Sequence, residues 1–555
     1  MKRGLLVVPL AVSILFGAGC HASRDDAAGQ AGELADPVRR ENAVANITRL
    51  HSLALERARG DRNNAGVKAV VDATIEKLVQ TYVEHPEDVQ NGQHIINVLY
   101  EMRDVRGLPA LTKAFDWRQE VNEEHAIRAA ETVRSMSVPE AQKGPVIEAL
   151  HQALEKVTGA RPADNRMRIG FIRALGSLRD RRTTPVLTKI ATAQVEAQSF
   201  LINRLAAHEL GQLGDPATVP AMIQCLFLFA PNNPAMRMND VAAEALVQIG
   251  RPAYEPLLAV LRGQDQAANA IAQQYIEAVR QRDERAASQM NLRTITSGEA
   301  TFTLGALGFR DALEPLVAEA GTENIDRRIS GAIALVRLNL EPADLPRVRG
   351  VLEGVYSSAP LQAKPQLLVA IQHLYDGEAL PFLLAEARDG DLHPDVRVQA
   401  VNGYGLLATR SEAGELRSLI EREPRSEDGG YRENFAAIAP ALDAAAACDR
   451  DVACWIGKLA DRDNIVVRKA ATMLGRFGRG NARAIEALVE RFGHMDLEVR
   501  LSALSALDHI AVSGSAAAVA KIEHLHETED GQSIWSHFSR EALTVQARLR
   551  IRAAR

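Results

Sequence analysis

The phrase LGQLGDPATVPAMIQCL, from Leu210 to Leu226, returns in altered form along most of this chain, at 174–190, 245–261, 305–320 and 473–489. Its prolines keep a nearly constant spacing: Pro185, Pro220 and Pro256 are 35 and 36 residues apart. Repetition at this period, with helical patterning inside each period, is typical of stacked helix pairs that pack only on their neighbours. The sequence therefore predicts an all-α solenoid from residue 42 to residue 555.

The best-preserved junction shows how one helix ends and the next begins. Leu205, Leu210 and Leu213 are spaced to line one helical face. Gly214 can take the left-handed conformation that ends a helix. Asp215 can cap the next helix, and Pro216 suits its first position, where a missing N–H costs nothing. Aromatic residues make up only 4% of the chain, which also favours helices over strands.

A second signal lies inside the repeats, where an aspartate precedes a helix and an arginine follows near its start. It is seen in DNIVVRKAATMLG from Asp463, in DLEVRLSALSAL from Asp496 and in DVRVQAVNGYG at 395–405. These phrases resemble HEAT repeats, particularly the phycobilisome-lyase HEAT-like repeats, over residues 91–525. The resemblance implies a structural ladder between repeats that involves Asp463 with Arg468 and Asp496 with Arg500. It implies little about function, because such arrays serve many tasks.

The N-terminus reads as a secretory signal. Lys2 and Arg3 precede an apolar run at 5–16, too short to span a bilayer as a permanent helix, and then Gly-Ala-Gly-Cys ending at Cys20. This end resembles a bacterial lipoprotein processing site, with 1–19 as the signal peptide and Cys20 as the lipid-bearing residue. Ordinary cleavage near Ala22, or an incidental cysteine, is the alternative. Because His21 follows the cysteine, the outer membrane is favoured over the inner one within the bacterial cell envelope. Residues 20–41 have little apolar content and are expected to form a flexible tether.

Three further cysteines agree with export. Cys448 and Cys454 are six residues apart, a distance that a short loop can close into a disulfide in an oxidising compartment. The alternative is a metal site, but two cysteines without a nearby histidine make a poor zinc set. Cys225 lies on an apolar stripe and is expected to be a small buried side chain.

Motifs for chemistry are mostly missing, so we expect no catalytic residues, no cofactor and no metal. The glycines at 474–482 stand at a helix-pair junction without the strand and lysine of a phosphate loop. The acidic and histidine cluster at 524–530 would diverge on a helix. A net charge of −6 disfavours nucleic acid as a partner. A basic run is either a solvated face or a patch for an anionic partner: Arg161, Arg166, Arg168, Arg173, Arg179, Arg181 and Arg182. The arginines near the C-terminus, at 548, 550, 552 and 555, suit a helix C-terminus.

Two irregular stretches interrupt the period, at 263–299 and 422–447. Insertions in solenoids often lie on the binding face, although a degenerate repeat or an additional packing helix explains these stretches equally well. In HEAT families the second helix of each pair lines the concave surface, which would expose segments such as 205–213 and 468–477. The sequence thus favours a non-catalytic, lipid-anchored scaffold that binds a protein or peptide on its concave surface and the membrane through Cys20. The alternatives are an envelope enzyme or cofactor-handling lyase, which predicts a cluster of titratable groups in one pocket, and a purely structural spacer.

Overall fold

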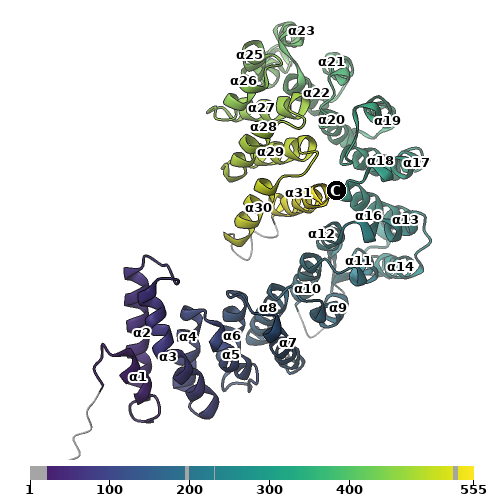
Figure 1. The fold of residues 1–555 in the computed structure, drawn as a ribbon. Coiled ribbons are helices and arrows are strands. Elements are labelled where there is room, and N and C mark those ends of the chain that lie inside the picture. The colour runs from purple at the N-terminus through teal and green to yellow at the C-terminus, as the bar shows by residue number, and fades with distance from the viewer. Residues whose placement is uncertain (1–21, 160, 194–198, 231, 529–535, 555) are drawn as a thin grey trace, which may run out of the picture. The chain divides into compact units, whose positions relative to one another are not determined.

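The computed structural model describes residues 22–159, 161–193, 199–230, 232–528 and 536–554, and nearly all of its regular structure is helical (Figure 1). Within these ranges the strands are confined to one small hairpin, β1 (Phe229–Ala230) and β2 (Asn233–Arg237). The prediction of an all-α solenoid of helix pairs is confirmed. The chain divides after Leu178 into two compact units, which we describe separately.

Unit 1 stacks its helices in two layers. One layer is α2, α4, α6 and α8, each packed on the next, and the other is α3, α5 and α7. Its helices are α1 (Ala27–Glu33), α2 (Arg40–Arg57), α3 (Ala65–Glu84), α4 (Val89–Met102), α5 (Leu108–Ala114), α6 (Glu123–Arg134), α7 (Glu140–Glu155) and α8 (Pro162–Ser177), with a 3-10 turn at Val105–Gly107.

The prediction of a flexible tether at 20–41 does not agree with the structure of unit 1. Residues Ala27–Glu33 form α1, which packs on α2 and α3, and Leu34 is fully buried. Arg40 is buried as well, and its guanidinium donates to the Leu34 carbonyl at 2.9 Å and to Asp88 at 2.8 Å. Because a single buried leucine and a buried arginine anchor the segment, its low apolar content did not indicate a tether.

Unit 2 contains the remaining helices. They are α9 (Thr184–Thr192), α10 (Phe200–Leu213), α11 (Val219–Cys225), α12 (Asn239–Ile249), α13 (Tyr254–Leu261), α14 (Gln266–Arg280), α15 (Glu284–Ser288), α16 (Leu292–Leu307), α17 (Leu313–Ala320), α18 (Ile325–Val336), α19 (Leu345–Ser358), α20 (Lys364–Gln372), α21 (Leu380–Arg388), α22 (Pro394–Leu407), α23 (Arg410–Arg422), α24 (Arg432–Ala436), α25 (Ala439–Cys448), α26 (Val452–Lys458), α27 (Asn464–Phe477), α28 (Ala482–Val489), α29 (Leu497–Ile510), α30 (Ala516–Thr528) and α31 (His537–Ala553). Short 3-10 turns lie at Arg181–Thr183, Pro216–Thr218, Arg251–Ala253, Arg310–Ala312, Pro342–Asp344, Leu361–Ala363, Gly377–Ala379, Ser426–Asp428 and Glu490–Gly493.

The junction read from the sequence forms as expected, with one refinement. Gly214 ends α10 in the left-handed region at φ 66°, and the Asp215 carboxylate accepts from the Ala217 amide at 3.1 Å. The proline opens a 3-10 turn, and α11 begins only at Val219. Gly211 sets the spacing of the stacked helices, because a Cβ there would lie 2.6 Å from the Ala245 Cα on α12.

Both irregular stretches are folded into the packing of unit 2. In 263–299, α14 buries Ala268, Ala272 and Ile276 and packs on α11, α15 and α16. The second stretch forms α24 and α25, with Phe435 fully buried beneath the Arg397 guanidinium at 5.0 Å. Both segments therefore act as additional packing helices.

Helix α31 closes unit 2 on itself. One layer of helices runs from α12 through α16, α18, α20, α22, α27 and α29, each in contact with the next, and α31 packs on both α29 and α12. Figure 1 shows α31 lying between these two helices. The Gln248 side chain of α12 donates to the Leu543 carbonyl at 2.9 Å, and Arg540 pairs with Asp240. The layer of helices in unit 2 is therefore closed by α31, which joins its last helix to its first.

A carboxylate in the interior pairs with the C-terminal half of α31. Asp508 on α29 lies 3.0 Å from the Arg548 guanidinium and 2.9 Å from that of Arg552. Burial alone raises the pKa of Asp508, but the two arginines outweigh burial and hold it below its usual value. Burial lowers the pKa of Arg548 to about 10. The reading of these arginines as a simple positive helix end is therefore corrected, because Arg548 and Arg552 are interior partners of one aspartate.

Substitution of this aspartate should weaken unit 2. Asp508→Asn leaves two buried guanidinium groups without their counter-charge, and we expect a loss of about 3 to 5 kcal/mol in the free energy of unfolding. Asp443→Asn is the matched control, because Asp443 is 70% exposed in its pair with Arg417, and should cost less than about 1 kcal/mol. Urea denaturation followed by circular dichroism compares them. Equal losses would contradict a closing role for Asp508.

Candidate functional site

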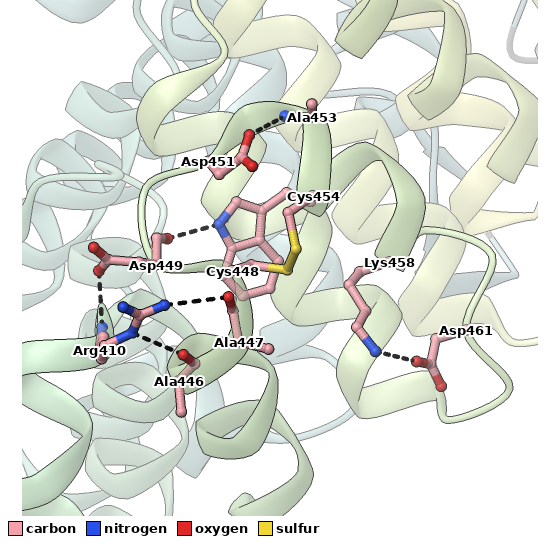
Figure 2. The surroundings of a disulfide bond; sticks show 11 residues. Arg410, Ala446, Ala447, Cys448, Asp449, Asp451, Ala453, Cys454, Lys458 and Asp461 are labelled. Carbon is pink, nitrogen blue, oxygen red and sulfur yellow. Dashed lines mark hydrogen bonds and ion pairs between the residues drawn. A yellow bond between two sulfur atoms is a disulfide. The ribbon is translucent and has the colours of Figure 1, made fainter.

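The Cys448–Cys454 disulfide is confirmed and is structural. It joins the end of α25 to α26 with a Cα–Cα distance of 5.4 Å (Figure 2). Beside it, the Trp455 indole donates to the Asp449 carbonyl at 2.8 Å, and the Arg410 guanidinium donates to the carbonyl of Ala446 at 2.7 Å. Cys225 is buried as expected, and burial raises the pKa of its thiol to about 12.

Reduction of the bridge should destabilise unit 2. By restricting the unfolded chain, a bridge that closes so short a loop is expected to contribute about 2 kcal/mol to the free energy of unfolding. Reductant should therefore lower the urea midpoint of the wild type. The Cys448→Ser/Cys454→Ser variant should start at that lower midpoint and not respond to reductant. A wild-type midpoint that ignores reductant would contradict the expectation.

The aspartates and arginines of the expected ladder contact other groups than each other. Asp463 caps α27 by accepting from the Ile465 amide at 2.8 Å, and Asp496 caps α29 by accepting from the Val499 amide at 3.0 Å. Between these repeats, Asn464 donates to Asp496 at 2.7 Å, and Arg468 lies 3.7 Å from Glu498. Arg500 stacks over the Phe538 ring at 4.7 Å. The four residues are structural, but their aspartates cap helices and their arginines turn to other groups.

Cys20 lies outside the described residues, as do the signal peptide and the side chains at 526–530. Within the described ranges, no helix is long and apolar enough to cross a membrane. The same ranges contain no group of three or more His, Cys, Asp or Glu side chains placed to hold a metal ion.

The two segments expected to line an open surface are buried. On α10, Leu205, Ala206 and Leu210 are inaccessible or nearly so. On α27, Lys469 is fully buried, and its ammonium donates to the carbonyls of Gly405 and Leu406 at 3.0 Å each, at the end of α22. Burial holds the pKa of Lys469 well below its usual value. Because α22 and α27 pack directly on each other, most of the segment at 468–477 is covered by neighbouring helices.

Unit 1 presents an open face instead. Helices α2, α4, α6 and α8 line two adjacent hollows of about 420 and 380 Å³, which share Arg128. Each helix contributes residues at helical spacing, such as Glu124, Ile127, Arg128 and Glu131 on α6. We call this surface the unit 1 groove; its lining residues are Glu41, Val44, Ala45, Thr48, Gln93, His94, Asn97, Val98, Tyr100, Glu101, Glu124, Ile127, Arg128, Glu131, Arg134, Arg166, Ile169, Gly170 and Arg173.

Charge is sorted along the unit 1 groove. At the α2 end the charged lining residues are Glu41 and Glu101, and at the α8 end they are Arg166 and Arg173. Between them, α6 carries two acidic and two basic lining residues. Arg128 pairs with Glu131 at 2.8 Å and stacks over the Tyr100 ring at 4.8 Å, Glu124 pairs with Arg166 of α8, and Arg134 is the fourth. The groove therefore has an acidic end, an aromatic centre and a basic end.

The basic run noted in the sequence divides between two roles. Arg161 pairs with Asp164 at 2.6 Å, and Arg168 donates to the Val157 carbonyl at 2.7 Å, so these two are structural. Arg179 likewise donates to the Gln212 carbonyl within unit 2. Arg166 and Arg173 face the groove. The run was recognised in the sequence, but helical register and tertiary pairing decide which of its members line the groove.

Unit 2 contains a third hollow, of about 450 Å³ and partly open, between α18, α20, α29 and α31. Several titratable groups line it, among them His373, Tyr375 and His509. The Tyr375 ring lies 4.9 Å from the ring of His509 and 6.2 Å from that of His373. Burial lowers the pKa of each histidine to about 4, with Arg468 adding to the effect at His373 and Arg479 at His509. Both imidazoles are therefore neutral near pH 7.

These histidines should make unit 2 acid-sensitive. In the unfolded chain a histidine takes up a proton below pH 6.5, whereas His509 in the folded chain stays neutral until about pH 4. Stability must therefore fall as pH falls through this window. Between pH 7 and 4.5 we expect the wild type to lose about 2 kcal/mol more than His509→Gln. Urea denaturation at both pH values tests this; parallel losses in the two proteins would contradict it.

Comparison with known proteins does not assign the chain to a family. No protein-family model matches it, and no curated protein sequence does. Among solved structures, a chain of a Kap95:Nup1 complex is similar over 95% of this chain and 74% of that one, at 13% identity and a TM-score of 0.44. A similarity of this level carries no information about function.

Proposed function

We propose that this protein is a helical-repeat scaffold that binds a segment of a protein partner in the unit 1 groove. The observation that carries the proposal is the sorted charge of the groove, which runs from Glu41 and Glu101 to Arg166 and Arg173 across α2, α4, α6 and α8. A purely structural spacer gives no reason for this order. Helices packed 8 to 10 Å apart place the two ends about 30 Å from each other, the reach of about nine extended residues.

The groove indicates the chemistry of the partner segment. Acidic side chains would face α8, basic side chains would face α2, and an apolar or cationic group would meet the Tyr100 ring. Of the two arginines at the basic end, Arg166 is 56% exposed in its pair with Glu124, so exchanging this intramolecular pair for an intermolecular one costs little desolvation. Complementary charge also speeds association and fixes the direction in which the segment lies.

We further propose that the scaffold is exported and anchored in the bacterial cell envelope through lipid on Cys20. The signal-like N-terminus supports export, and so does the Cys448–Cys454 bridge, since such bridges persist in oxidising compartments. The seven residues from Cys20 to the start of α1 at Ala27 span at most about 25 Å. Unit 1 would therefore work close to the membrane, and its partner would be a membrane-proximal protein.

Site-specific photo-crosslinking in the native cell tests the groove. A photo-crosslinking amino acid at Asn97 or Ile169, both in the groove, should give one discrete adduct. The matched control is Gln152, an exposed residue of α7 that lies outside both hollows. Arg166→Glu with Arg173→Glu should abolish the adduct from Asn97, whereas Arg388→Glu, in an exposed pair of unit 2, should leave it unchanged.

Two outcomes would contradict the proposal: equal adducts from Gln152, or adducts from Asn97 that survive the double charge reversal. The anchor is tested separately by metabolic labelling with a fatty acid, which should be lost in Cys20→Ser. Retained label in that variant would refute lipidation at Cys20 without affecting the groove.

A further inference from the structure

The hollow of unit 2 is a formed cavity whose walls come from distant parts of the chain. Residues of α18 and α20 face residues of α29 and α31 across it, and Tyr375 bridges the two sides by a 2.9 Å hydrogen bond to Ser505. Its volume is about 450 Å³. This lies within the range of small-molecule sites.

The lining combines an apolar body with a few polar groups. The apolar wall comes from Ile333, Val336, Leu338, Val369, Ala370, Leu501, Leu504 and Val545. The His373 and His509 imidazoles also line the space, and both lie near the Tyr375 ring. Over the described residues, no hydrogen bond holds either imidazole, and neither is fully buried. A neutral imidazole offers one donor and one acceptor, so both rings remain available to a ligand.

The charges around the cavity are unequal. Three guanidinium groups line it, from Arg337, Arg548 and Arg552, against two carboxylates, from Asp508 and Glu541. The carboxylates are already engaged: Asp508 by Arg548 and Arg552, and Glu541 by Arg337 at 2.7 Å. Arg468 and Arg479 add positive potential at the two histidines, with Glu498 offsetting Arg468 in part. One positive charge therefore remains in the lining.

From this combination we infer that the unit 2 cavity binds a small organic anion with an apolar, ring-containing body. The body packs on the aliphatic wall and beside Tyr375, while the negative group lies toward the arginines. The ligand's remaining polar atoms meet His373 and His509. This site is independent of the unit 1 groove and does not require the proposed partner.

The test uses two fluorescent probes of nearly equal shape, anilinonaphthalene sulfonate and its uncharged analogue phenylnaphthylamine. Fluorescence titration of the full-length protein should show saturable binding of the anion at one site per chain. The uncharged analogue should bind at least about tenfold more weakly, a difference of about 1.4 kcal/mol. Binding should also raise the unfolding temperature, because the probe binds only the folded chain.

Cavity variants locate the site. Val369→Trp fills the cavity and should weaken anion binding at least about tenfold. Gln366→Trp, at an exposed position on the cavity rim, should do the same and guards against misfolding of the first variant. Ala45→Trp, which fills a hollow in unit 1, is the control and should leave binding unchanged. Circular dichroism confirms that each variant is folded.

The inference is overturned if the tryptophan variants of the cavity bind the anion as tightly as the wild type. It is also overturned if Ala45→Trp alone loses binding, or if the uncharged analogue binds equally well. Photo-crosslinking from Asn97 is unaffected by Val369→Trp if the two sites are independent, so failure of this site and failure of the groove can be told apart.

Discussion

The closed form of unit 2 depends on one buried carboxylate, Asp508, which holds Arg548 and Arg552 of α31 inside the ring of helices. Two guanidinium groups in an interior are costly unless a counter-charge meets them. Asp508 pairs with both, and Glu541 of α31 pairs with Arg337, the residue that follows α18. These ion pairs fix α31 against α29 and α18, and the same helix reaches α12 through Arg540. The cavity exists because these contacts hold α31 along one of its walls.

The two units use the same repeat differently. In unit 1 the layer formed by α2, α4, α6 and α8 keeps an open face with sorted charge. In unit 2 the corresponding layer turns onto itself, so that Lys469 of α27 meets the carbonyls at the end of α22. One unit thus keeps an open groove, in which we propose that an extended chain binds, and the other contains a partly open cavity, in which we infer that a small molecule binds.

Local features of the fold could be predicted from the sequence, and distant ones could not. Gly214, Asp215 and the proline after them are neighbours, so the junction they form was readable, as was the bridge between Cys448 and Cys454. The hairpin at 229–237 was missed because two short strands give no usable period. Arg548 looked like a solvated helix end because nothing near it in the sequence reveals Asp508. The groove could be predicted only in part. The basic run contains Arg166 and Arg173, but the folded helices were needed to separate these two from Arg161 and Arg168.

Helix α31 also changes how unit 2 must fold. Solenoids usually assemble from neighbouring contacts, so each repeat can settle as soon as the next is made. Here Asp240 pairs with Arg204 of the neighbouring α10 and also with Arg540, which lies 300 residues further along the chain. At ordinary rates of synthesis Arg540 is made on the order of 15 to 60 s later. During this time the face of α12 that packs on α31 in the folded unit stays uncovered. Unit 2 thus combines the local assembly of a repeat array with the long-range closure of a globular domain, and its unfinished interior is the stage at which chaperones have most to protect.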